Sequence, residues 1–333
     1  MAGNPKQKIK LLCVLDILKE FSDEDHPIDA TSICDKLKSE YDITAERKSI
    51  YDDIAILEDY GVDIIKTRVP KFGYFIGYRD FDVPEISLLV DAVESANFIT
   101  QKKTKQLVEK LGKLVSQWQA KDINKQVYID NRNKCTNEEI FYSIDKINSA
   151  IKNSQKISFT YIRRSLGDNK RISETLKEMT VSPYALVWES DHYYLIGNVE
   201  KYENLIHLRL DRMKGVKVLN AKSRHFSEVS EYKTFFDVAD YVRKSFNMYG
   251  GELKNIELKC NINKLEQVID RFGDKLYLRP DESGSFTFTT KANISEGLIG
   301  WLLQFDNDIE VVSPIELRNS IIERIERIRK VYK

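Results

Sequence analysis

The first eighty residues carry apolar positions spaced as in three short helices. An apolar residue recurs at every third position from Ile9 to Leu18, which predicts an amphipathic helix. Asp29 has the short carboxylate that often caps a helix N-terminus, so a second helix is expected after it. Thr44 is a similar cap for a third helix, which ends at Gly61.

Two strand-like runs follow, over 62–68 and 74–76, and the turn between them contains Pro70 and Gly73. Runs of this kind about a Pro/Gly turn predict a β-hairpin. Three short helices followed by a hairpin is the order of elements in a winged helix-turn-helix. We therefore predict that fold for residues 1–80.

The remaining chain divides into four segments with different apolar patterns. Residues 81–139 have helical periodicity and are expected to form a linker or dimerisation segment. In residues 140–226 a helix over 141–151 is expected to precede four short strand-like runs, over 156–161, 181–187, 193–199 and 205–210, and these suit a small β-barrel better than a parallel sheet. A linker over 227–253 precedes alternating strands and helices over 254–333. The predicted fold class is a multidomain α+β protein.

The distribution of charge adds to this picture more than its total does. The 52 basic and 52 acidic residues cancel over the whole chain. Residues 1–80 hold 12 basic against 16 acidic side chains, whereas residues 141–226 hold 15 against 9. The basic surplus in the middle of the chain is complementary to a negatively charged ligand there.

Missing motifs disfavour several classes of protein. The sequence has no apolar run of the ~20 residues that a membrane helix needs, and its polar, basic start lacks a signal-peptide core. The four cysteines lie far apart and resemble reduced cysteines of a cytosolic protein. We therefore expect a cytoplasmic protein without a membrane partner.

Enzymatic motifs are missing as well. The sequence has neither a phosphate-binding glycine loop nor an H-E-x-x-H motif, and it has no Gly-x-Ser-x-Gly elbow. Its four histidines lack metal-ligand spacing. We therefore expect no enzyme activity, no cofactor and no metal, although the sequence leaves open a hydrolase that uses scattered carboxylates.

The third predicted helix carries donors suited to phosphates and base edges. If Ile50, Ile54 and Leu57 face the core, Lys48 and Asp52 turn outward. The alternative is a helical domain that packs against protein while its charges are solvated. The expected DNA contacts are Arg47, Lys48, Ser49, Tyr51, Lys66, Arg68 and Lys71, to which the amino terminus adds Lys6, Lys8 and Lys10.

The stretch from Glu46 to Ile54, continued by Leu57 and Gly61, resembles the recognition helix of DeoR-like winged-helix regulators. Members of that family commonly show a Thr/Ser-Ile-Tyr-Arg-Asp-Ile pattern there. Asp52 stands where the family often has arginine, which removes one DNA contact. The resemblance implies a DNA-binding regulator of transcription.

Residues 140–226 resemble the WYL domain, whose name-giving triplet is here Tyr193-Tyr194-Leu195. Its other motifs follow in the family's order and spacing, over 159–161, 182–184, 192–197 and 207–212. The resemblance implies a small Sm/SH3-like barrel that binds nucleic-acid fragments or nucleotides. It also implies that the barrel passes this signal to the DNA-binding domain.

The side chains of this segment agree with such a ligand, because aromatic rings that stack on bases lie beside arginines that contact phosphates. Alternatives stay open: Tyr194 and Leu195 can be ordinary strand residues, and Arg212 can form a structural bridge with Asp211. The expected ligand contacts are Tyr161, Arg163, Arg164, His192, Tyr193, His207, Arg209 and Arg212.

Residues 254–333 resemble the C-terminal extension that accompanies WYL domains, through segments 301–305 and 310–314. That extension is implied to help dimerisation and regulation, and Asp306 stands where the family usually has glycine. The sequence thus predicts a homodimeric transcriptional regulator, whose partners are double-stranded DNA and a nucleotide or single-stranded nucleic-acid ligand. The alternative is a non-enzymatic adaptor that binds single strands and uses its winged helix for protein contacts.

Overall fold

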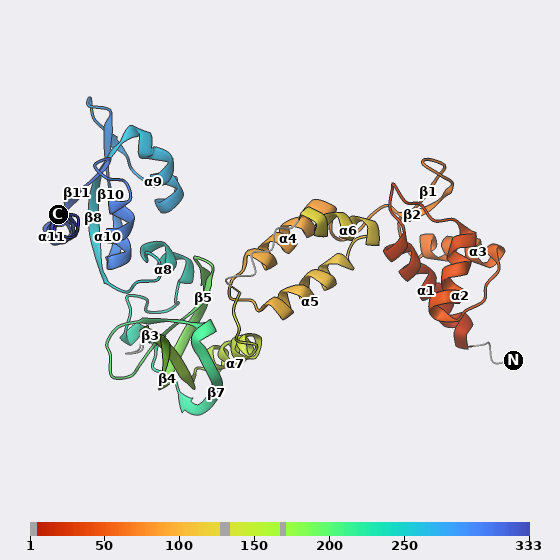
Figure 1. Cartoon of the computed structure of the whole chain (residues 1–333), viewed down its shortest axis with the longest axis horizontal. Coiled ribbons are helices and arrows are strands. Elements are labelled where there is room, and N and C mark those ends of the chain that lie inside the picture. Colours follow the sequence, from red (N-terminus) through yellow and green to blue (C-terminus); the bar gives the residue numbers. More distant parts are fainter. Residues whose placement is uncertain (1–4, 127–133, 167–170) are drawn as a thin grey trace. The chain divides into compact units, whose positions relative to one another are not determined.

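The computed structural model describes residues 5–126, 134–166 and 171–333, with the side chains of 5–8 and 124–126 outside this description. The chain divides into two compact units, Met1–Thr136 and Asn137–Lys333. The first is helical apart from one hairpin, and the second contains two larger sheets (Figure 1). This mixture of helices and sheets confirms the predicted α and β composition. No helix in the described ranges is long and apolar enough to cross a membrane.

The start of the first unit has the predicted order of three helices and a hairpin. The two strands are antiparallel and pair Ile64 with Ile76 at one end and Thr67 with Gly73 at the other. Gly73 is required here, because a Cβ at this position would lie 2.8 Å from the backbone of Ile28. The elements are α1 (Pro5–Phe21), α2 (Ala30–Tyr41), α3 (Arg47–Asp59), β1 (Ile64–Thr67) and β2 (Gly73–Ile76).

The third helix does not begin directly after Thr44, so the predicted cap at that residue is wrong. α3 starts at Arg47, and its N-cap residue is Glu46. Asp42 ends α2 in the left-handed conformation, with φ 52°, and Ile43 is buried in the core. Because Ile43 is packed there, the connection stays extended until residue 46 and only then turns into the helix.

Asp29 caps α2 as predicted, since its Oδ1 accepts a hydrogen bond of 2.7 Å from the backbone N–H of Ser32. The inner faces of the three helices and the hairpin share one core. Ile50, Ile54 and Leu57 are all buried in it, which confirms the predicted inner face of α3. The opposite side of α3 is thereby left to solvent.

Three further helices follow: α4 (Val83–Ser95), α5 (Gln101–Gly112) and α6 (Gln117–Gln126). Their small core is built on Ile86 and Val90 of α4. Leu88 and Leu89, which helical periodicity also marked as apolar, lie on the outer side, and Leu88 is 70% exposed. The role of this segment as a linker or dimerisation element stays a prediction.

A polar junction joins α6 to the loop between α1 and α2. The buried Asp23 carboxylate accepts hydrogen bonds from the Ser116 hydroxyl and, at 2.8 Å, from the His26 backbone N–H. The His26 ring stacks on Trp118 with 4.6 Å between centroids. Arg79 donates to two backbone carbonyls at the end of α1, at 2.8 and 2.9 Å. The Asp23–Ser116 and His26–Trp118 contacts hold the start of α6 against the three-helix domain, and Arg79 fixes the segment after β2 to the end of α1.

The second unit begins with a helix and a five-stranded antiparallel sheet in the order β6-β5-β4-β3-β7. Among the described residues the outer strands β6 and β7 do not pair, so the predicted barrel is not closed. A short 3₁₀ turn, η2, connects them. The elements are α7 (Ile140–Lys152), β3 (Gln155–Leu166), β4 (Ile172–Glu189), β5 (His192–Asn198), β6 (Ile206–Arg209), η2 (Leu210–Arg212) and β7 (Met213–Lys222).

The last of these strands, β7, was not predicted from the sequence. It contains Gly215 at φ 62°, and its pairing with β3 shifts register twice. Each shift breaks the two-residue alternation by which strands are recognised. Because its pairing is irregular, β7 lacks the alternation of apolar and polar residues from which a strand is predicted.

Different elements pack against this sheet. α7 contacts β3, β4 and β7, and Ile157 and Phe159 of β3 are fully buried. Ala185 and Ile196 share a core with Phe236 and Met248, which lie in the segment after β7. The predicted linker over 227–253 thus contributes a packed layer to the sheet.

The carboxyl-terminal part is an α+β unit with a four-stranded sheet in the order β11-β8-β10-β9. Phe286 and Phe288 of β10 are fully buried in its core. The remaining elements of the chain are η3 (Phe226–Glu228), α8 (Val238–Lys244), β8 (Glu252–Asn261), η4 (Ile262–Lys264), α9 (Leu265–Phe272), β9 (Arg279–Pro280), β10 (Ser285–Ile294), α10 (Glu296–Leu303), β11 (Ile309–Ser313) and α11 (Ile315–Val331).

Candidate nucleic-acid interface and ligand site

The first turn of α3 presents basic side chains to solvent. Arg47 and Lys48 are the first two residues of the helix, and both are exposed. Glu46 makes no side-chain hydrogen bond to the helix, so the first backbone N–H groups are not capped by it. Uncapped N–H groups beside two cations are a combination that binds phosphate. Tyr51, one turn further along, is 44% exposed.

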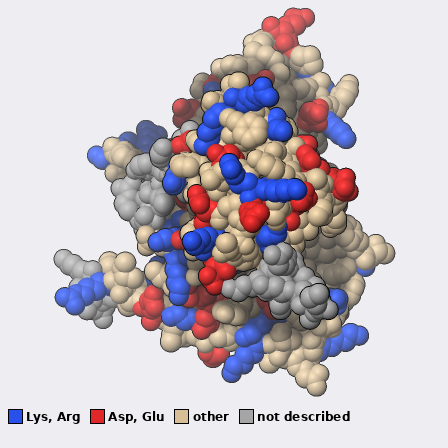
Figure 2. Space-filling view, turned by 90° about the vertical axis from the view of Figure 1, so that its right-hand side faces the viewer, with Lys and Arg blue, Asp and Glu red and all other residues tan. Residues whose placement is uncertain are grey.

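Acidic side chains lie close to these cations. Asp52 is exposed on the outer side of the same helix. On the face drawn in Figure 2, basic and acidic side chains are intermixed and form no continuous basic surface. Electrostatic attraction to DNA would therefore come from a few positioned cations rather than from the net charge of the domain.

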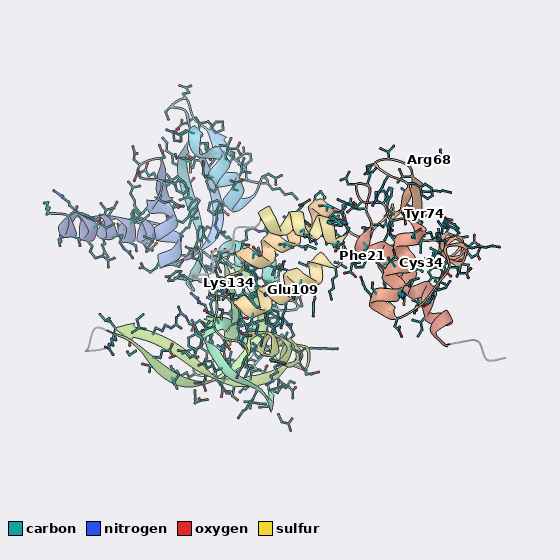
Figure 3. All side chains as sticks on the ribbon, turned by 45° about the vertical axis from the view of Figure 1, so that its right-hand side comes forward. Phe21, Cys34, Arg68, Tyr74, Glu109 and Lys134 are labelled. Carbon is teal, nitrogen blue, oxygen red and sulfur yellow. The ribbon has the colours of Figure 1, made fainter. Side chains whose placement is uncertain are left out.

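The hairpin carries a second group of predicted DNA contacts. Lys66, Arg68 and Lys71 are all exposed, and Figure 3 shows Arg68 toward the outer end of the hairpin. The Lys66 ammonium lies 5.9 Å from the centre of the Tyr74 ring. The Tyr51 ring of α3 lies 6.4 Å from that of Tyr74, so α3 and the hairpin are neighbours and present their basic residues together.

Lys10 differs from its expected role as a DNA contact, because it is buried beneath α3 and only 5% exposed. Its Nζ lies 2.6 Å from Asp53 Oδ2 and donates a hydrogen bond to the Ser49 hydroxyl. An ammonium enclosed in this way cannot reach a phosphate, so the expectation for Lys10 is wrong. Lys6 and Lys8 lie outside the described side chains.

In the second unit, several of the predicted ligand residues meet on β5 and β6. Tyr194 pairs with Arg209 across the two strands, and the His192 ring lies 6.2 Å from that of Tyr194. Arg209 donates two hydrogen bonds to the Asp211 carboxylate, from Nε to Oδ1 at 3.0 Å and from Nη2 to Oδ2 at 2.7 Å. Arg212, an expected ligand contact for which a bridge to Asp211 was the alternative, is exposed. Burial and the nearby Arg209 lower the pKa of His192.

Other predicted ligand residues are placed differently. The Tyr161 ring is buried, and its hydroxyl accepts a hydrogen bond of 3.3 Å from the Arg209 backbone N–H. Arg163 and Arg164 are exposed on the outer part of the β3–β4 ribbon, where Arg164 pairs with Glu174 across the strands. Tyr193 is half-buried. The structure thus does not gather the eight residues into one pocket.

His207 is half-buried in the second unit. Its Nε2 is 2.7 Å from the Tyr241 hydroxyl, which belongs to α8. Burial lowers the pKa of His207 from 6.5 to about 4 and raises that of Tyr241 to about 12. Both groups are therefore neutral at neutral pH, and His207 joins β6 to α8 instead of facing solvent.

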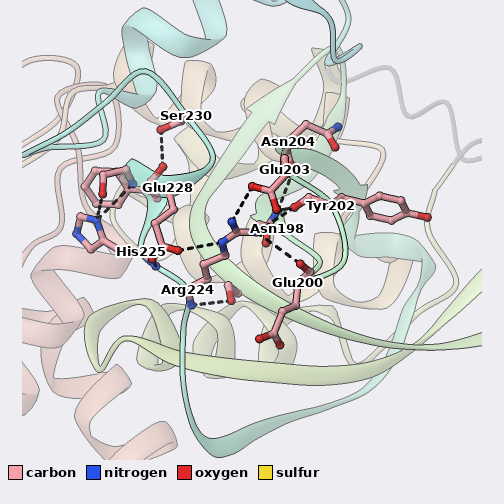
Figure 4. A network of polar contacts seen from close by, with 12 residues as sticks. Asn198, Glu200, Tyr202, Glu203, Asn204, Arg224, His225, Glu228 and Ser230 are labelled. Atoms are coloured by element: carbon pink, nitrogen blue, oxygen red, sulfur yellow. Dashed lines mark hydrogen bonds and ion pairs between the residues drawn. The ribbon is translucent and has the colours of Figure 1, made fainter.

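Arg224 organises a polar network that sequence analysis missed (Figure 4). Its guanidinium pairs with Glu203 at 2.7 Å and with Glu228 at 3.2 Å. It also donates to the carbonyl of Tyr202 at 3.2 Å. The basic surplus of residues 141–226 was a signal for such a residue, but no motif singled out position 224. In this network the arginine fixes the loop between β5 and β6.

Two cavities adjoin that network. A cavity of about 290 Å³ is lined partly by Lys156, Lys201 and the fully buried Asn198. Another of about 540 Å³ lies between the β5–β6 loop, α8 and the start of β8. Lys244, which lines the second cavity, is held by Asp240 at 2.5 Å and by a second carboxylate at 2.9 Å. In the smaller cavity Lys156 is paired with Glu200 at 2.6 Å, and Lys201 is exposed.

Comparison with known proteins identifies two domains in the chain. Residues 143–218 match the WYL domain, and residues 253–329 match the WCX domain. An uncharacterized HTH-type transcriptional regulator, YobV of Bacillus subtilis (strain 168), is 26% identical over 188 residues, which are 56% of this chain and 55% of that protein.

Among solved structures, Proteasome accessory factor B/C (PafBC) of Arthrobacter aurescens matches 96% of this chain and 46% of its own, at 18% identity and a TM-score of 0.27. The chain spans about half the length of each of these two proteins.

The described residues contain no group of three or more His, Cys, Asp and Glu side chains arranged to hold a metal ion.

Proposed function

We propose that this chain, which carries a WYL domain and a WCX domain, is a DNA-binding transcriptional regulator. Its first eighty residues act as a winged helix-turn-helix, in which α3 enters the major groove and the hairpin contacts the adjacent backbone. The observation that carries the proposal is the exposure of Arg47 and Lys48 on the first turn of α3, next to the basic hairpin. The similarity to an HTH-type regulator supports it.

The test is a salt titration of duplex binding by the full chain. Each phosphate contact contributes a slope of about −0.9 to the plot of log affinity against log salt concentration. Lys48→Ala should therefore weaken binding and reduce the slope by about 1. Lys102→Ala, which removes an exposed lysine from α5, should leave the slope unchanged. Equal slopes for all three proteins would contradict the assignment of α3.

We further propose that the chain acts as a homodimer. Two α3 helices would then occupy half-sites about 34 Å apart, one turn of the duplex. The helical segment over 81–139 and the WCX domain would set that distance. Light scattering of the full chain, with footprinting of the bound duplex, would reveal a dimer and a palindromic site. A monomer that protects one half-site would contradict this part of the proposal.

We also propose that the WYL domain, with its five-stranded sheet, senses an anionic, nucleotide-like ligand. The support is the arrangement on β5 and β6, where His192 and Tyr194 lie beside Arg209 and exposed Arg212. Ligand binding would shift the population between DNA-competent and DNA-incompetent states. Arg212→Ala should weaken binding of a short single-stranded oligonucleotide, whereas Lys152→Ala on α7 should not. Identical affinities would remove Arg212 from the site.

A second candidate function is an adaptor that binds single-stranded nucleic acid and uses its winged helix for protein contacts. It is favoured by the charge distribution, because the basic surplus lies in residues 141–226 and not in residues 1–80. Titration of the full chain with duplex and single-stranded DNA at the same salt concentration separates the two functions. The regulator should prefer its own duplex site, whereas the adaptor should prefer single strands.

A further inference from the structure

The strongest unexplained feature of the first unit is the polar cluster of Lys10, Ser49 and Asp53 beneath α3. Lys10 is 5% exposed and Asp53 7% exposed. The Lys10 ammonium lies 2.6 Å from Asp53 Oδ2, donates to the Ser49 hydroxyl, and lies 3.4 Å from the Ser49 carbonyl oxygen. One side chain of α1 thus holds two successive turns of α3.

Stability alone does not account for this cluster. Taking two charges out of water costs several kcal/mol, and a buried ion pair is often no more stable than apolar residues of similar size. α3 already has an apolar inner face of Ile50, Ile54 and Leu57. An ion pair adds a preferred orientation of the helix to such a face. Its charged atoms must meet within a narrow range of distances and angles, whereas contacts between methyl groups tolerate many arrangements.

Rotation of α3 about its own axis is the motion that the cluster opposes. Side-chain atoms lie about 5–6 Å from a helix axis, so a rotation of about 20° moves them by about 2 Å. A shift of that size would break the 2.6 Å contact between Lys10 and Asp53. It would also take a donor out of the 2.7–3.2 Å range in which it can hydrogen-bond a base.

The opposite side of α3 carries the residues that this rotation would displace. Lys48 and Asp52 lie next to Ser49 and Asp53 in sequence but are exposed. Because the helix is rigid, any rotation at the cluster is passed in full to Lys48 and to the neighbouring Arg47. Base recognition depends on such positions, whereas attraction to phosphates does not.

We propose that the Lys10–Ser49–Asp53 cluster fixes the rotation of α3 and thereby determines which DNA sequence the chain prefers. Lys10 and Asp53 are positioning residues in this inference and do not touch DNA. The inference rests on the proposed function, since it assumes that α3 is the helix that recognises DNA. It assigns sequence preference to a contact that lies on the far side of that helix.

The experiment compares the full chain with the double variant Lys10→Met/Asp53→Leu, in which an apolar pair replaces the ion pair. The preferred site is first selected by the wild-type protein from a random duplex library. Affinity is then measured for that site and for a scrambled duplex of equal length. The double variant should bind the scrambled duplex within about twofold of wild type, while its preference for the selected site falls at least tenfold.

Lys19→Met is the matched control, because it makes the same change at an exposed position of α1 and should keep the preference. If the double variant fails to fold, Asp53→Glu keeps the charge while lengthening the side chain, and should still lower the preference. A folded double variant that keeps the wild-type preference would overturn the inference and leave the proposed function intact. A wild-type protein that selects no duplex would overturn both.

Discussion

His207 gives a prediction whose size follows from its surroundings. The residue is half-buried, and its Nε2 lies 2.7 Å from the Tyr241 hydroxyl of α8. The fall in its pKa from 6.5 to about 4 corresponds to about 3 kcal/mol, at about 1.4 kcal/mol for each pKa unit. Protonation of His207 should therefore destabilise the second unit by an amount of that order.

The sign follows from proton linkage. The folded state binds this proton more weakly than the unfolded state, so the unfolded state holds more protons between pH 6.5 and about 4. The contribution of the neutral ring is complete above pH 6.5 and is lost as the pH falls through that window. Its slope approaches about 1.4 kcal/mol per pH unit.

The assay is urea unfolding of the full chain at a series of pH values, followed by tryptophan fluorescence. His207→Gln keeps a neutral hydrogen-bonding side chain, so the free energy of unfolding of this variant should depend less on pH between 6.5 and 4. His225→Gln, which alters an exposed histidine, should behave like wild type. A difference between wild type and His207→Gln that stays constant over this pH range would refute the argument.

Three further substitutions test the fold. Asp29→Ala removes the cap of α2 and should cost about 1 kcal/mol in chemical denaturation; no loss would show that the cap is not needed. Ser116→Ala leaves Oδ2 of the buried Asp23 without its hydroxyl donor and should cost about 1–3 kcal/mol, with loss of amide-exchange protection at the start of α6. Unchanged protection would contradict the junction. Phe288→Ala should lower the free energy of unfolding by about 3–5 kcal/mol, whereas Tyr277→Ala, at an exposed position, should change the denaturation midpoint little. Equal effects of the two substitutions would contradict the assigned core.

The elements that the sequence predicted well are those with uninterrupted periodicity. Ile50, Ile54 and Leu57 recur at helical spacing and are all buried in α3. Position 29 carries a capping residue whose bond is local, so it could be recognised without knowledge of the rest of the fold. The WYL and WCX domains were recognised because several motifs occur in order.

Features that depend on contacts between distant segments could not be predicted in this way. Lys10 has the character of a surface residue, and only the approach of Asp53, more than forty positions along the chain, makes it a core residue. His207 is likewise half-buried, and it contacts Tyr241 of α8, a helix that no local pattern placed beside it. Arg224 and Asn198 gain their roles from a loop whose shape no local pattern specifies. The bounds of the five predicted segments and the two sets of site residues stay predictions.

The most direct test of the central claim is the salt dependence of binding to the duplex that the full chain selects from a random library. The candidate phosphate contacts are the five exposed cations on α3 and the hairpin, namely Arg47, Lys48, Lys66, Arg68 and Lys71. If all five contact phosphates, each protomer should contribute about −4.5 to the slope of log affinity against log salt concentration. Enrichment of one duplex sequence with a slope of that size would support a DNA-binding regulator. Failure to enrich any sequence, with a slope near zero, would contradict it.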